Sequence, residues 1–71
     1  MIEVTKPVSR LRCGDKFLNG VRVFGVTQVG GRGTSVMVIT APVKREGIRE
    51  VPDGALRYTE YAPDTLVIVL V

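Results

Sequence analysis

The most reactive side chain in this sequence belongs to Cys13, its single cysteine. A thiol becomes a nucleophile beside a cation, and Arg12 and Lys16 are close to it along the chain. The chain has no histidine, however, so neither a Cys-His nor a Ser-His pair can form. We therefore interpret Cys13 as a buried or semi-buried structural thiol, and we expect no catalytic residue and no enzymatic activity.

Two pairs of carboxylates are the next candidates for chemistry, Glu46 with Glu50 and Asp53 with Glu60. General acid–base catalysis needs two carboxylates that converge in a cleft, and 71 residues leave little room for one. A calcium loop needs closely spaced acidic residues followed by glycine, and zinc needs more Cys or His than this chain has. We interpret these residues as solvated turn positions and predict no metal and no cofactor.

Residues 30–35, Gly-Gly-Arg-Gly-Thr-Ser, resemble a phosphate-binding loop in composition. Exposed main-chain N–H groups together with Arg32 can hold an anion. A nucleotide phosphate loop, however, continues as Gly-Lys-Ser/Thr into a helix, and here an apolar β-type segment follows. A flexible hairpin tip is the favoured interpretation, and contact of Arg32 with a phosphate or acidic surface is the alternative.

Positive charge is concentrated in the first half of the chain. The net charge is +3, with +4 in residues 1–33 and −1 in residues 34–71. A basic half can face an acidic partner such as nucleic acid, and Phe17 and Phe24 lie among the basic residues. A core this small needs both phenylalanines, so a solvated surface of mixed charge remains the other interpretation. The residues that would contact an anion or nucleic acid are Arg10, Arg12, Lys16, Arg22 and Arg32.

The elements that must position these residues are short strands. The chain has 13 Val, 4 Ile and 6 Thr, which favour pleated sheet, and 8 Gly and 4 Pro divide it into short segments. No window shows a helical apolar stripe. We predict one all-β domain over residues 1–71, a small barrel or compact β-sandwich of five to six short antiparallel strands. The predicted strands are residues 2–5, 16–18, 21–29, 34–41, 56–61 and 66–71.

Three connections carry specific predictions. Asn19-Gly20 predicts a tight two-residue hairpin with Leu18 opposite Val21. The apolar phase changes at Gly25, which predicts a bulge or sharp bend in residues 21–29. Residues 42–54 are compatible either with a hairpin that turns at Glu46-Gly47 or with a single helical turn. In the connector of residues 8–15, Val8 and Leu11 are predicted to point into the core.

Residues 8–15, Val-Ser-Arg-Leu-Arg-Cys-Gly-Asp, followed by a strand, an Asn-Gly turn and Val-Arg-Val at 21–23, resemble the opening of small SH3-like β-barrel proteins. Similar short chains occur among proteins of actinobacterial phages. The resemblance covers roughly residues 8–40, and Cys13 stands where such turns often carry proline. It implies an SH3-like fold and a phage origin, and it carries over no functional residue.

The last segment of the chain is the candidate protein interface. It has no charge, no proline and no polar side chain, so both its faces and both its edges are expected to be covered. Because the chain is too small to cover every strand, one face is predicted to contact another copy or a partner protein. The interface residues are Leu66, Val67, Ile68, Val69, Leu70 and Val71.

The resulting hypothesis is a non-enzymatic protein-interaction module, with a phage structural, assembly or host-binding role implied by the resemblance. The alternative is a nucleic-acid-binding small barrel that uses the basic half. A single cysteine fits a reducing compartment, and the longest apolar run of six residues is far below the 18 or so that a membrane span needs. No signal sequence is recognisable. We expect a cytoplasmic protein or a member of an intracellular assembly.

Overall fold

A computed structural model describes residues 2–31 and 34–71 of the chain. These residues form antiparallel strands and the short 3-10 turn of residues 8–10, with no α-helix among them, so the all-β prediction is confirmed. In chain order the elements are β1 (Glu3–Pro7), the 3-10 turn η1 (Val8–Arg10), β2 (Lys16–Phe17), β3 (Arg22–Val29), β4 (Ser35–Ala41), β5 (Val43–Glu46), β6 (Arg49–Pro52), β7 (Arg57–Tyr61) and β8 (Leu66–Leu70).

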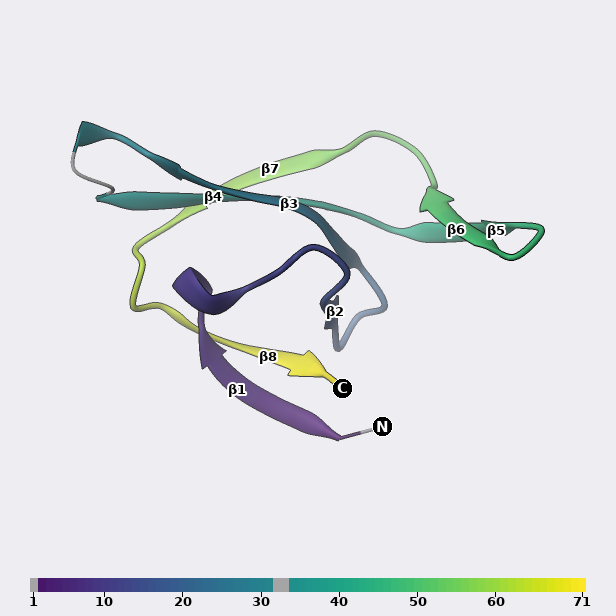
Figure 1. Ribbon diagram of the computed structural model, residues 1–71, viewed down its shortest axis with the longest axis horizontal. Coiled ribbons are helices and arrows are strands. Elements are labelled where there is room, and N and C mark those ends of the chain that lie inside the picture. The colour runs from purple at the N-terminus through teal and green to yellow at the C-terminus, as the bar shows by residue number, and fades with distance from the viewer. Residues whose placement is uncertain (1, 32–33) are drawn as a thin grey trace.

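Six strands make one antiparallel sheet in the order β1-β8-β2-β3-β4-β7, and β5 pairs with β6 in a separate two-stranded sheet. Among the described strands, β1 and β7 end the large sheet without pairing with each other. The sheet is therefore open, and the closed form of the predicted barrel is not what the structure shows. The described residues form eight strands rather than the predicted five to six, because β5 and β6 add a separate hairpin. Figure 1 shows β1 and β8 on one side of the molecule and β3, β4 and β7 on the other.

A bulge in β3 bends the large sheet. Val23 lies opposite Thr40 and Gly25 opposite Ile39, so Phe24 is an extra residue in the β3–β4 ladder. The bend predicted at Gly25 is confirmed. A Cβ atom at this position would lie 3.1 Å from Cδ1 of Ile39, so glycine also permits the close approach of the two strands. Because a bulge increases local twist, the two halves of the sheet can face each other.

The core lies between these two halves and is made of aliphatic side chains. Its buried members are Val8, Leu11, Val23, Val36, Val38 and Val69. Phe17, Val26, Tyr61 and Val67 pack against them while remaining partly exposed. Val8 and Leu11 come from η1 and the residue after it, which confirms the inward orientation predicted for them.

The Asn19-Gly20 turn differs by one residue from the predicted hairpin. Phe17 N–H donates to Val21 O at 2.8 Å, and Gly20 N–H donates to Phe17 O at 3.0 Å. Phe17, not Leu18, therefore lies opposite Val21, and the loop has three residues with Gly20 at φ +86°. A type I turn followed by a left-handed glycine gives this arrangement, whereas the prediction assumed a two-residue turn.

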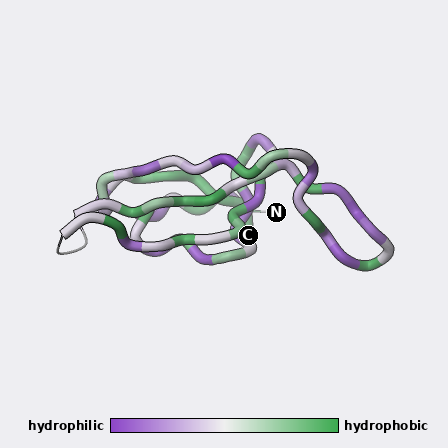
Figure 2. The backbone as a smooth tube through the Cα atoms, turned by 90° about the horizontal axis from the view of Figure 1, so that it is seen from above, coloured by the Kyte–Doolittle hydropathy of each residue, from purple (hydrophilic) through white to green (hydrophobic). Residues whose placement is uncertain are grey.

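Residues 42–54 form the hairpin of β5 and β6, and the helical-turn alternative is wrong. Glu46 lies opposite Arg49, so the loop is Gly47-Ile48, with Gly47 at φ +65°. The hairpin protrudes from the rest of the chain along the longest dimension of the molecule, which is 41 Å (Figures 1 and 2). Its root is closed by a hydrogen bond from Asp53 N–H to Pro42 O at 2.8 Å.

Candidate interaction surface and the cleft beside strand β7

Strand β8 pairs along its whole length with β1 on one side, and on the other side its last two residues, Val69 and Leu70, pair with β2. The prediction that both edges are covered is therefore confirmed for the β1 side and only for the end of the strand on the β2 side. Its faces differ: Val69 is fully buried and Val67 half-buried, whereas Leu66 and Ile68 are 67% and 40% exposed. One face of β8 therefore lies in the core, and the opposite face is open to solvent in the single chain.

The open side of β8 continues into a small apolar surface. Leu18, which is 52% exposed, lines the same shallow hollow as Leu66 and Ile68, and we call these three residues the outer apolar face. At the end of β8, Leu70 pairs with Glu3 of β1 and with Lys16 of β2. Cross-strand partners share a face, so this surface carries one acidic and one basic residue at its end.

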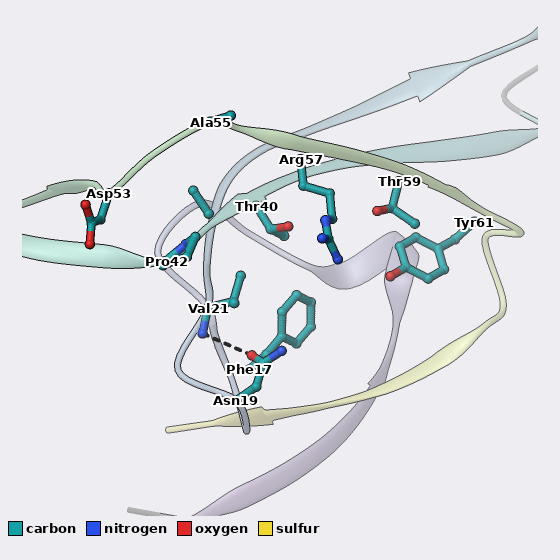
Figure 3. A pocket seen from close by; sticks show the side chains of 11 residues that line it. Phe17, Asn19, Val21, Thr40, Pro42, Asp53, Ala55, Arg57, Thr59 and Tyr61 are labelled. Atoms are coloured by element: carbon teal, nitrogen blue, oxygen red, sulfur yellow. Dashed lines mark hydrogen bonds between the residues drawn. The ribbon is translucent and has the colours of Figure 1, made fainter.

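A cleft of about 470 Å³ lies where the edge of β7 comes near the β2–β3 turn. Figure 3 shows the side chains of Arg57, Thr59 and Tyr61 directed from β7 toward Phe17. These three residues alternate along β7, so they share its inward face, and the exposed Tyr58 and Glu60 share the other. Thr40 lies opposite Arg57 on the neighbouring strand β4, and together with Ala41 and Pro42 at the end of that strand it extends the same wall of the cleft.

The cleft is continuous with the hollow beside the outer apolar face. That hollow measures about 490 Å³ and shares Phe17, Asn19 and Tyr61 with the cleft. Asn19 is held in place because its Oδ1 accepts a hydrogen bond from Val21 N–H at 3.0 Å (Figure 3). A single surface therefore runs from Arg57, past two aromatic rings, to Leu66 and Ile68.

The basic residues of the first half are only partly available to an anion. Arg10 and Arg12 are exposed, and Lys16 is half-buried in β2. Arg22 is half-buried, and its Nη1 lies 3.0 Å from Oε1 of Glu50. Arg32 lies outside the described residues. The predicted anion contacts thus include one guanidinium that is already bound to a carboxylate of the same chain.

Asp15 holds the turn before β2. Its Oδ2 lies 2.7 Å from Nζ of Lys6 and accepts a hydrogen bond from Arg12 N–H at 2.9 Å. Burial by itself would raise the pKa of this carboxyl group. The hydrogen bonds from Lys6 and from the Arg12 main chain, together with the charges of both residues, outweigh burial and hold the pKa below its ordinary value.

Cys13 is exposed, so the prediction of a buried or semi-buried thiol is wrong. Its Sγ donates to Phe24 O at 3.3 Å, at the extra residue of the β3 bulge. The carboxylates Glu46, Asp53 and Glu60 are exposed, as predicted, although Glu46 and Glu60 lie in strands rather than turns. Glu50 is half-buried in β6 and paired with Arg22, so the prediction of a solvated turn position is wrong for this residue. Across residues 2–31 and 34–71, no group of three or more Cys, Asp or Glu side chains is placed to hold a metal ion.

Comparisons with protein-family models, with curated proteins and with solved structures give no match to this chain. In the part of the chain that the structure describes, no helix has the length and hydrophobicity to cross a membrane. The inward face of β7 was missed as a site by the sequence reasoning. The alternation of Arg57 and Thr59 was visible, but their approach to Phe17 depends on how the sheet bends.

Proposed function

We propose that this chain is a non-enzymatic protein-interaction module that associates with another copy of itself or with a partner protein through the outer apolar face. One observation carries the proposal: Leu66 and Ile68 are exposed in a strand without any polar side chain. Single exposed apolar residues are common on proteins, but a contiguous apolar surface marks an interaction site. Covering such side chains is favourable by about 25 cal/mol per Å² of apolar area.

A second copy of the chain is one occupant that fits this surface. The apolar centre ends beside Glu3 and Lys16, which flank Leu70 on its two sides. In a two-fold contact the same surface meets itself, so a surface that carries both charge signs can pair acidic with basic residues. The basic half has less support as a nucleic-acid site, because Arg22 and Lys6 are already paired with Glu50 and Asp15.

The proposal includes the finer fold, an open SH3-like barrel. The support is the strand-bending bulge at Phe24 and the stacking of the two half-sheets around one core. A phage structural, assembly or host-binding role rests on the sequence resemblance alone.

Light scattering of wild-type protein and of Ile68→Lys, at low and at millimolar concentration, tests the proposal. We expect wild-type protein to associate and the variant to stay monomeric with an unchanged circular dichroism spectrum. Ile48→Lys is the matched control, because Ile48 is 97% exposed but lies at the hairpin tip. A wild-type protein that is monomeric at the highest concentration would overturn self-association through this face.

A further inference from the structure

We propose that the cleft beside β7 binds an extended segment of a partner protein that carries an acidic side chain, and that this segment adds to the sheet along the edge of β7. The inference deepens the proposed function, on which it rests, by naming the form and chemistry of the partner. The cleft adjoins the outer apolar face, so one partner segment can cover both.

The edge of β7 supplies the main-chain contacts. Within the described strands β7 pairs with β4 on one side, and its other edge ends the large sheet. The N–H and C=O groups of such an edge are ready to pair with another strand. The strand covers five residues, which corresponds to roughly 17 Å of extended chain. An added strand of similar length would reach along the whole cleft.

Arg57 supplies the charge preference. Figure 3 shows its guanidinium group directed into the cleft, between Thr40 and Tyr61. The ion pairs of the described residues are those of Lys6 with Asp15 and of Arg22 with Glu50, so the carboxylate that would match Arg57 is not among them. Arginine and a carboxylate can form two parallel hydrogen bonds, which favours an acidic group here.

The other lining residues determine where the acidic and the apolar side chains of the bound segment lie along the cleft. Asp53 lies at the hairpin root, at the opposite end of the cleft from Tyr61 (Figure 3), and disfavours an acidic group there. From Arg57 the surface leads past Phe17 and Tyr61 to Leu66 and Ile68. Alternate side chains of an added strand face the same way. The segment therefore combines an acidic residue facing Arg57 with an apolar residue two or four positions away.

Selection from a display library of random heptapeptides on immobilised wild-type protein tests this chemistry. We expect enriched peptides to share an acidic residue with an apolar residue two or four positions from it. Selection on the charge-reversed Arg57→Glu protein should instead enrich a basic residue. Enrichment without an acidic preference on wild-type protein, or no enrichment, would overturn the inference.

The best peptide is then titrated into wild-type protein, Arg57→Gln and the control Arg49→Gln, which removes an exposed arginine of the hairpin. Loss of a charge-assisted hydrogen bond should weaken binding by about tenfold or more in Arg57→Gln and leave Arg49→Gln unchanged. Arg57 is exposed, so equal melting temperatures of the three proteins are expected. Equal affinities would contradict the role of Arg57.

Main-chain pairing is tested by methylating the peptide nitrogens. If the peptide adds as a strand, methyl groups on one alternate set of nitrogens abolish binding and those on the other set are tolerated. Tolerance at every position would rule out strand addition. If peptides fail while Ile68→Lys still abolishes self-association, the inference fails and the proposed function stands.

Discussion

Arg22 of β3 and Glu50 of β6 are joined by an ion pair that links the protruding hairpin to the large sheet, with 3.0 Å between Nη1 and Oε1. Both side chains are about three-quarters shielded from solvent, at 25% and 28% exposure. The Nε atom of Arg22 is buried without a hydrogen-bond partner, which lessens the net gain from the pair. A two-stranded hairpin is marginal by itself, so this link and the Asp53–Pro42 hydrogen bond define its orientation.

Replacing Glu50 by alanine should release the hairpin from this link. We expect a loss of about 1 kcal/mol in the free energy of unfolding, because partly exposed ion pairs contribute little. Amide hydrogen exchange in residues 43–52 should accelerate more than exchange in β4. Glu46→Ala is the control, since Glu46 is exposed and lies across from Arg49 near the tip. Unchanged exchange in Glu50→Ala would mean that the ion pair does not hold the hairpin.

The lowered pKa of Asp15 predicts that the folded chain loses stability in acid. Its pKa is lowered in the folded chain, so at low pH the unfolded chain binds a proton first, and stability falls as pH decreases. The loss should begin near the ordinary pKa of aspartate, about 3.9, and continue through the lower folded value. In Asp15→Asn this part of the pH dependence should disappear, whereas Asp64→Asn should retain it. Chemical denaturation at several pH values between neutral and strongly acidic provides the measurement.

Gly20 should not tolerate a β-branched residue. Its φ of +86° is unfavourable for L-residues, so Gly20→Val is expected to destabilise the fold by about 1–2 kcal/mol. Gly20→Asn should cost less, because asparagine enters the left-handed region more readily. No heavy atom lies within 4 Å of the position that a Cβ would take, so any loss reflects the backbone rather than a clash. Equal melting temperatures for the valine and asparagine variants would contradict this.

A lysine introduced at two adjacent positions of β8 should affect the stability of the fold very differently. Val69 is fully buried, so Val69→Lys is expected to cost several kcal/mol, because an unpaired charge is poorly tolerated in a core. Ile68 is 40% exposed, and Ile68→Lys should remain folded. Urea denaturation of both variants gives the comparison. Similar unfolding midpoints for the two would show that the alternation of buried and exposed faces along β8 is wrong.

Much of the local structure could be predicted from the sequence because turns and β-branched runs have local causes. Strands were placed within two residues at 21–29, 34–41 and 66–71, and the bend at Gly25 followed from the change in apolar phase. The Asn-Gly pair indicated a turn but not its loop length, because a glycine with positive φ serves both two- and three-residue hairpins.

The predictions that were wrong or missing concern features that depend on contacts between distant segments of the chain. Nothing local indicates that Cys13 lies at the surface beside Phe24, eleven residues away. The cleft depends on the approach of Tyr61 to Phe17, which the bend in β3 determines. For the last strand, composition suggested that both faces are covered. The open side of Leu66 and Ile68 depends on distant segments, because the core elements pack only on the side of β8 that carries Val67 and Val69.

The protruding hairpin has a practical consequence for engineering. Its tip, Gly47-Ile48, is exposed and far from the core, and exposed loop tips are preferred sites for tolerated insertions and for proteolytic nicking. A short epitope or a fluorescent reporter inserted between these two residues should therefore leave the packing of the large sheet intact. The same exposure makes the tip accessible to a protease, and cleavage there would leave two fragments held together by the sheet.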